Sequence, residues 1–195
     1  MFPHFFGGFG RRLVSLIAAT AIAATTVVAT APVASADNLD RTSEQVIAQI
    51  EAEPWPYYVR GDRSVDIAAA RKLLAHHGYR SDSTTSRFFN LSLENTVKRY
   101  QRAHSLTATG ALDDATWEKL RSTTFGEYGQ GSSGLVVQAI QKLLKEKGIA
   151  PNLVVDGLYG PATERAVRDA QRKFGIGVDG ITGRYTFRAL VTYQP

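Results

Sequence analysis

The chain has 195 residues, of which 44% are hydrophobic and 21% charged, and 23 Lys and Arg against 18 Asp and Glu give a formal net charge of +5. This composition indicates a globular protein, because a disordered chain has fewer apolar residues and more net charge. The chain contains no cysteine. That absence excludes disulfide frameworks, thiol nucleophiles, cysteine-ligated zinc and lipidation of an N-terminal cysteine.

Residues 1–36 have the pattern of an export signal. Arg11-Arg12 supply a positive start, residues 13–28 form an uncharged apolar stretch, and Ala34-Ser35-Ala36 supply a small-x-small cleavage pattern. We therefore expect cleavage after Ala36, by either Sec or Tat export, and a secreted mature chain that is extracellular or associated with the cell wall. An uncleaved membrane anchor is the alternative, since the stretch up to the cleavage pattern is long enough to span a bilayer.

The mature chain is only mildly basic. Removal of the signal takes away two arginines and no acidic residue. So small a charge does not indicate nucleic-acid binding, and export separates the protein from DNA. We expect no nucleic-acid partner.

The mature chain repeats itself at an offset of 70 residues without a gap. The identical pairs include Gly61/Gly131, Ala69/Ala139, Leu73/Leu143, Leu74/Leu144, Gln101/Gln171, Gly110/Gly180 and Thr116/Thr186. A constant offset of this kind indicates a duplicated module. We place the copies at residues 61–122 and 131–195, with a linker at 123–130. Because residues 122–133 are rich in Gly, Ser and Thr, we expect hinge freedom between the copies.

Each copy shows three helical patterns and no convincing strand. In the second copy, the pattern predicts a helix ending near Gly148, another from Gly160-Pro161 to just before Gly175, and a short third helix after Gly183. The first copy repeats this order, with Asp113 as the expected N-cap of its third helix. A module of this size has little core, so we expect packing between modules or onto flanking segments.

The sequence pattern of residues 37–60 predicts an N-terminal helix followed by an extended segment. Thr42 and Gln45 form a capping-box pattern ahead of an apolar stripe, and Pro54-Trp55-Pro56 end the helix. We expect this helix to dock on the first module. The predicted class is all-α: two tandem three-helix modules preceded by a signal peptide and a short N-terminal helix.

The second copy carries a specific motif. Asp156-Gly157-Leu158-Tyr159-Gly160-Pro161-Ala162-Thr163 is followed by Gln171 and then by a second Asp-Gly turn at Asp179-Gly180. This spacing resembles the family called peptidoglycan-binding domain 1 over about residues 131–192. The resemblance implies a compact three-helix bundle and a noncatalytic role, the anchoring of exported proteins to the bacterial cell wall. Ala170 stands where the family usually has an aromatic residue.

The first copy resembles a diverged member of the same family. Ser86-Arg87 replace the first Asp-Gly pair, Leu93 replaces the threonine, and Thr109 replaces the aspartate of the second turn. We expect the fold to be kept, and ligand binding by this copy stays open. Aromatic residues gather in and before this copy, where core filling is favoured over stacking on glycan. They are Trp55, Tyr57, Tyr58, Tyr79, Phe88, Phe89, Tyr100 and Trp117.

For the second copy we predict a ligand-binding surface. Peptidoglycan offers stem-peptide carboxylates, amides and flat sugar faces, which suit arginine and tyrosine side chains. The predicted residues are Tyr159, Thr163, Arg165, Arg168, Gln171, Arg172, Asp179 and Tyr185. A structural role in loops and helix starts is the alternative for Asp179, Thr163 and Gln171, and tethering is favoured for the glutamine. We expect Tyr159 and Tyr185 at the mouth of a groove, and we expect replacement of Tyr159 and Arg168 to leave the melting temperature unchanged.

The sequence shows no catalytic or metal-binding pattern. His76 and His77 are neighbours on a predicted helix and point to different faces, so they cannot share a metal ion. H-E-x-x-H, G-x-S-x-G, S-x-x-K and phosphate-loop motifs do not occur. The repeats also leave no segment for a catalytic domain. We expect no enzyme activity, no cofactor and no metal.

Three function classes remain. The leading one is a secreted noncatalytic protein whose partner is peptidoglycan, through its stem peptide and glycan. The second is a secreted interaction or inhibitor protein that uses the same fold against another secreted protein. The third, which is disfavoured, is a cryptic cell-wall hydrolase.

Overall fold

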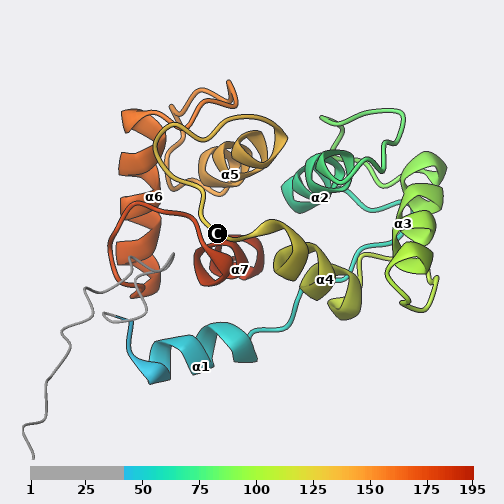
Figure 1. Cartoon of the computed structure of the whole chain (residues 1–195), viewed down its shortest axis with the longest axis horizontal. Helices are drawn as coiled ribbons and strands as arrows, with labels where there is room; N and C mark the ends of the chain where they lie inside the picture. Colours follow the sequence, from blue (N-terminus) through green and yellow to red (C-terminus); the bar gives the residue numbers. More distant parts are fainter. Residues whose placement is uncertain (1–41) are drawn as a thin grey trace, which may run out of the picture. The chain divides into compact units, whose positions relative to one another are not determined.

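The computed structural model describes residues 42–195, and the predicted signal peptide at 1–36 lies outside this range. Over the described residues the chain forms seven helices, and its extended pairing is limited to isolated β-bridges. The helices are α1 (Glu44–Ala52), α2 (Val65–His76), α3 (Leu91–Ala103), α4 (Asp114–Thr124), α5 (Leu135–Glu146), α6 (Pro161–Phe174) and α7 (Arg184–Thr192) (Figure 1). The all-α class predicted from the hydrophobic pattern is confirmed.

Short backbone bridges tie the loops of each module together. α2, α3 and α4 belong to the first copy, and α5, α6 and α7 to the second. The bridges join Arg63 with Phe88 and Tyr58 with Leu112 in the first copy, and Ser133 with Leu158 and Tyr128 with Thr182 in the second. Each bridge of the second copy lies 70 residues after its counterpart. The duplication therefore holds for the loops as well as for the helices.

The two copies start their helices by different means. In the first copy a side chain caps each helix, as Asp113 does for α4 by accepting from the N–H of Thr116 at 2.9 Å. In the second copy a glycine precedes each helix, and none has a side-chain cap. Pro161 is the first residue of α6, where its missing N–H is not needed. The predicted cap at Asp113 and the predicted start of α6 are both confirmed.

α2 packs against α5, and this contact joins the two modules. Every residue of α2 from Val65 to Ala75 is buried, and the three alanines at 68–70 have no exposed surface. Small side chains let helix axes come close together. Core residues of both modules consequently form one continuous hydrophobic cluster. The modules rely on each other for burial, as their small size predicted.

A buried ion pair crosses this contact. Lys147 Nζ lies 2.9 Å from Asp66 Oδ1 and donates to the carbonyl oxygens of Val191 and Tyr193 at 2.6 and 2.8 Å. Burial lowers the pKa of Lys147, and the charge of Asp66 acts against that shift. An unpaired charge in this position would be costly, so the pair and its hydrogen bonds fix how the modules meet.

α1 packs against α7 of the second module (Figure 1), and it reaches the first module, where it was expected to dock, through the ion pair of Glu51 with Arg121 of α4 at 2.6 Å. Its N-cap is Ser43 and not Thr42, whose Oγ1 accepts a hydrogen bond from the N–H of Gly177 at 2.9 Å. Arg188 of α7 donates three hydrogen bonds to backbone carbonyl oxygens at the end of α1. These bonds satisfy carbonyl groups that the helix itself leaves open.

Trp55 follows α1 and connects it to both modules. Its side chain is 6% exposed and stacks on Trp117 of the first module, with the ring centroids 5.7 Å apart. The ring also packs against Phe187 of the second module at 6.4 Å, and the guanidinium of Arg188 lies 4.5 Å from its centroid. Core filling, favoured for this aromatic residue, is confirmed.

Segment 123–130 is packed over much of its length. α4 continues to Thr124, and Phe125 is 8% exposed and stacks on Phe187 with a centroid distance of 4.0 Å. Tyr128 pairs through its backbone with Thr182. The composition of this segment suggested a hinge, but the ring of Phe125 and the backbone of Tyr128 hold it to the second module. This packing argues against the expected hinge freedom.

We expect Trp55→Ala to lower the free energy of unfolding by about 3–5 kcal/mol, because it removes a large side chain that both modules contact. Urea unfolding, followed by circular dichroism, measures the change. The matched control is Leu91→Ala, which removes an apolar side chain that is 53% exposed and should change stability by about 0.5 kcal/mol or less. Equal stability of both variants would contradict the assigned role of Trp55.

Candidate functional site

A buried glutamine ties the last turn of the second module to α6. Gln171 has no exposed surface, and its Nε2 donates to Asp179 Oδ1 at 2.6 Å and to the carbonyl oxygen of Ile181 at 2.9 Å. Its Oε1 accepts from the N–H of Gly180 at 2.8 Å. Both ends of the amide are therefore used within the fold, which is the tethering role favoured from the sequence.

α5 carries a second clamp of the same design, which the sequence analysis missed. Gln141 Nε2 donates to Asp156 Oδ1 at 2.8 Å and to Thr163 Oγ1 at 3.0 Å, and its Oε1 accepts from the N–H of Gly157 at 2.8 Å. The signal was available, because glutamine, Asp-Gly and threonine follow one another twice within this module. Each Asp-Gly turn thus has its own buried glutamine.

A groove lies beside the turn that Gln171 holds. Its volume is about 420 Å³, and the loop after α4, one side chain of α6 and the turn before α7 form its walls. The lining residues are Glu127, Gly129, Gln130, Ser132, Glu164, Asp179, Gly180 and Ile181. Within the described part of the chain, Asp179 Oδ2 is buried and has no hydrogen-bond partner. The exposed side-chain acceptors at the groove are those of Glu127 and Gln130, which suit the N–H groups of a ligand.

Gly180 sets the shape of one wall of this groove. Its φ is +78°, and a Cβ at this position would lie 2.7 Å from Cγ of Glu164 and 2.9 Å from Nε of Arg168. Arg168 Nη2 is held by Glu164 Oε1 at 2.6 Å. Glycine is needed here both for the left-handed backbone and for the close approach of this ion pair.

Three of the eight predicted site residues are buried. Tyr159, Thr163 and Gln171 are 2%, 2% and 0% exposed. The hydroxyl of Tyr159 donates to the carbonyl oxygen of Gly180 at 2.9 Å, so this residue supports the groove from below. The expectation that Tyr159 lies at the mouth of the groove is wrong, because its ring fills the core and only its hydroxyl needs a polar partner. Replacement of Tyr159 should therefore lower the stability, contrary to the expectation that the melting temperature stays unchanged.

Two predicted residues meet at the groove. Asp179 lines it, and Arg168 lies next to Gly180 with its side chain 38% exposed. Arg172, one turn further along α6, is 59% exposed and forms an ion pair with Asp169. The arginines of α6 are therefore at the surface, and two of them already have carboxylate partners.

The remaining two predicted residues lie elsewhere. Arg165 is exposed and lines a separate cavity of about 300 Å³ between α6 and the loop that precedes it. Tyr185 is half-buried and packs against the apolar cluster under α1, with the guanidinium of Arg184 5.0 Å from its ring centroid. The structure does not bring these two side chains to the groove.

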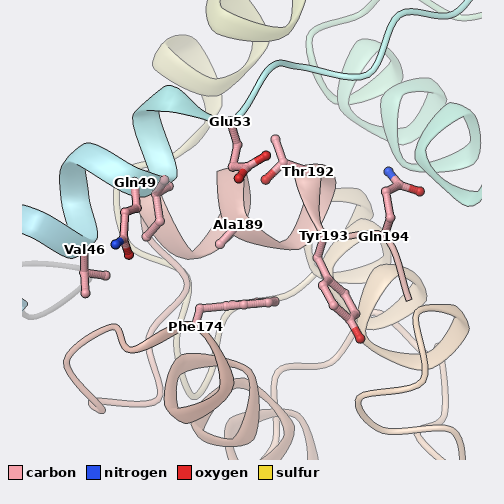
Figure 2. A pocket seen from close by; sticks show the side chains of 9 residues that line it. Val46, Gln49, Glu53, Phe174, Ala189, Thr192, Tyr193 and Gln194 are labelled. Carbon is pink, nitrogen blue, oxygen red and sulfur yellow. The ribbon is translucent and has the colours of Figure 1, made fainter.

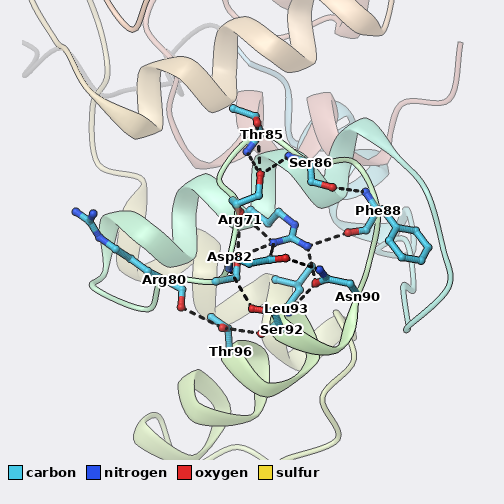
Figure 3. Close-up of polar contacts among 12 residues, drawn as sticks. Arg71, Arg80, Asp82, Thr85, Ser86, Phe88, Asn90, Ser92, Leu93 and Thr96 are labelled. Carbon is cyan, nitrogen blue, oxygen red and sulfur yellow. Dashed lines mark hydrogen bonds and ion pairs between the residues drawn. The ribbon is translucent and has the colours of Figure 1, made fainter.

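In the first module, an arginine takes the place of the first glutamine clamp. Arg71 lies 70 residues before Gln141 and is 1% exposed. Its Nη1 donates to Ser81 Oγ at 2.6 Å, Asp82 Oδ1 at 3.0 Å and the carbonyl oxygen of Ser83 at 2.9 Å. Figure 3 shows this guanidinium enclosed by the loop between α2 and α3.

The same guanidinium also holds the start of α3. Nη2 of Arg71 donates to the carbonyl oxygen of Phe88 at 2.9 Å and to Oδ1 of Asn90, the N-cap of α3, at 2.8 Å. A hydrogen bond from Asn90, followed by contacts with Arg71, keeps the pKa of Asp82 below its ordinary value. The lost Asp-Gly turn is thus compensated by one buried cation, which the sequence analysis did not single out.

A further pocket of about 380 Å³ lies between α1, α7 and the end of α6 (Figure 2). Phe174, Val46 and Ala189 supply much of its apolar surface. None of the eight predicted site residues lines it.

Over residues 42–195, the structure places no three His, Asp or Glu side chains where they could hold a metal ion. No helix in that range has the length and apolar character needed to cross a membrane.

Comparison with known proteins identifies the modules. The family described as "Putative peptidoglycan binding domain" matches residues 63–120 and 133–190, which together make up more than half of the chain. The chain belongs to this family. Both matches coincide with the structural repeat, so the first module is a family member despite its altered turn.

The relatives include two amidases and a carboxypeptidase. The chain is 30% identical over 147 residues to the N-acetylmuramoyl-L-alanine amidase CwlM of Mycobacterium tuberculosis. This alignment covers 67% of this chain and 36% of the amidase. It is 37% identical over 87 residues to the zinc D-Ala-D-Ala carboxypeptidase of Streptomyces albus G, covering 44% of this chain and 31% of the carboxypeptidase. It is 45% identical over 62 residues to the N-acetylmuramoyl-L-alanine amidase CwlL of Bacillus licheniformis, covering 31% of this chain and 17% of that amidase. The match therefore spans about a third or less of each of these relatives.

We expect Arg71→Gln to destabilise the protein by about 2–3 kcal/mol. The shorter side chain leaves buried carbonyl groups of the loop without a donor, and no Asp-Gly turn is present to use the new amide. Urea unfolding measures the loss, with Arg80→Gln as the control because Arg80 is an exposed arginine of the same loop. Wild-type stability of Arg71→Gln would show that the buried cation does not hold this loop.

The buried hydroxyl of Tyr159 predicts a dependence of stability on alkaline pH. Burial raises the pKa of Tyr159, so above pH about 10 the unfolded chain releases this proton while the folded protein keeps it, and stability falls. Tyr159→Phe should cost about 1 kcal/mol at neutral pH through the lost hydrogen bond, and this difference should shrink above pH about 10. Unfolding curves at several pH values test this, and a constant difference between the two proteins would contradict it.

Proposed function

We propose that this chain is a secreted, noncatalytic protein that binds peptidoglycan through the groove of its second module. The observation that carries the proposal is the groove itself, which lies in a domain of the peptidoglycan-binding family and is lined mainly by polar side chains. Binding sites of this kind combine a concave surface with a few placed polar groups.

The chemistry of the groove favours N–H donors of the stem peptide. Glu127 supplies an exposed carboxylate, and Gln130 adds an exposed amide that can donate or accept. Of the other two carboxylates, Glu164 is paired with Arg168, and Asp179 Oδ2 is buried. The amino group of a diamino acid and the amides of a stem peptide complement these groups through charge-assisted hydrogen bonds. This assignment differs from the expectation that arginines capture stem-peptide carboxylates, because Arg168 is already paired with Glu164.

The outer arginines form a second part of the proposed surface. Arg165 and Arg172 are exposed on α6 and project their charge into solvent. Stem-peptide carboxylates outside the groove would find cations there, although exposed pairs contribute little energy individually. The groove therefore supplies most of the proposed specificity.

Secretion and the absence of catalysis are also parts of the proposal. The export-signal pattern of residues 1–36 supports secretion, and the lack of a recognisable catalytic motif supports a binding role. The relatives are named as hydrolases, but the aligned part is a minor share of each of them. We therefore do not assign their activities to this chain.

Glu127→Gln should weaken binding to purified sacculi about tenfold, because it removes the charge from one hydrogen bond to the ligand. Glu127 is exposed, so the melting temperature should stay that of the wild type. Cosedimentation of the full mature chain with sacculi measures the affinity. The control is Glu53→Gln, which makes the same charge change at an exposed residue that does not line the groove.

The outcomes separate the alternatives. Equal binding by Glu127→Gln and the control would remove the groove from the proposal and keep wall binding. If the wild type does not sediment with sacculi, the protein-interaction hypothesis takes precedence. Release of soluble muropeptides by the wild type would contradict the noncatalytic assignment.

A further inference from the structure

The first module contains a cavity at the position equivalent to the groove of the second. Its volume is about 240 Å³. Each residue that lines it lies 70 positions before a residue that lines the groove, as Tyr57, Arg60 and Thr109 lie before Glu127, Gln130 and Asp179. The cavity has therefore been kept in both copies, while the residues at its edge have changed.

The floor of this cavity is built in the same way as that of the groove. Gly110 has a φ of +79°, and a Cβ there would lie 2.7 Å from Cε of Lys98 and 2.9 Å from Cγ of Glu94. Lys98 Nζ and Glu94 Oε1 form an ion pair at 2.6 Å, as Arg168 and Glu164 do in the second module. The backbone thus forms the same concave surface in the first module, although the loop between α2 and α3 lacks the Asp-Gly turn of the second module.

The chemistry of the cavity differs from that of the groove. One carboxylate remains, that of Glu94, which faces the ammonium of Lys98 and lies 3.7 Å from the guanidinium of Arg60. Of the three carboxylates that line the groove of the second module, the cavity keeps only the one that forms an ion pair, and Tyr57 and Thr109 stand at the positions of Glu127 and Asp179. A cationic ligand has little attraction here.

An exposed aromatic ring takes the place of a carboxylate at the cavity edge. The side chain of Tyr57 is 64% exposed, and Val59 beside it is 39% exposed. Most other aromatic residues of this region are buried or half-buried, so core filling does not account for Tyr57. A flat ring with hydrogen-bonding groups next to it is suited to a ligand with one apolar face and polar edges.

We propose that this cavity is a second ligand site and that it takes a sugar ring of an N-acetylhexosamine glycan strand. The C–H face of the sugar stacks on Tyr57, and its hydroxyl or acetamido groups accept hydrogen bonds from Arg60, whose side chain is 61% exposed. The identification of the strand as that of the cell wall rests on the proposed function. Because α2 and α5 pack together and share one core, the two sites belong to one folded unit.

The test uses tri-N-acetylchitotriose, a soluble glycan that carries no stem peptide. NMR titration of the full mature chain should show saturable shifts, and Tyr57→Ala should weaken binding about tenfold. Because Tyr57 is exposed, the melting temperature of this variant should not change. Leu91→Ala, which removes another exposed apolar side chain of the first module, and Glu127→Gln in the second groove should both bind as the wild type does.

The same proteins are tested for sedimentation with sacculi, so that the two proposals fail separately. If the wild type sediments with sacculi but does not respond to chitotriose, the glycan site is overturned and wall binding remains. The same conclusion follows if the wild type sediments and Tyr57→Ala binds the glycan as well as the wild type does. Binding of chitotriose that depends on Tyr57, without sedimentation, would support the glycan site and overturn wall binding.

Discussion

The packing of α2 against α5 is the contact on which the rest of the structure depends. Each module has only three short helices, and such a bundle cannot bury enough apolar surface by itself. The alanines at 68–70 let the two helices approach closely, and the pair of Asp66 with Lys147 fixes their register with a charge that cannot be left unpaired. Trp55 and Arg188 then fasten α1 across the joined modules.

The duplicated fold has tolerated a large change in one of its turns. Where the second module uses Gln141 and an Asp-Gly pair, the first uses Arg71 and a polar loop that its guanidinium binds at five points. A guanidinium spans a wider set of acceptors than an amide, so it can organise a loop that lacks the tight turn. The turn before the third helix of each module is held by a glutamine in both copies, Gln101 in the first and Gln171 in the second.

The conserved turn is also where both cavities lie. A glycine with positive φ and an overlying ion pair form the base of each. The residues at the edge of each cavity differ between the copies, as Tyr57 and Glu127 show. Duplication followed by change at the edges gives one folded unit two surfaces of different chemistry, and this division underlies both functional proposals.

The sequence by itself determined the helical class, the repeat of 70 residues, the family and several helix ends, because local periodicity, capping residues such as Asp113 and the position of Pro161 are encoded over a few neighbours. Only the tertiary structure decided that α1 docks on α7, since its partner Arg188 lies more than 130 residues away. It also placed Tyr159 inside and Tyr57 outside. Residue type could not separate these two tyrosines, because burial depends on which distant side chains surround each ring.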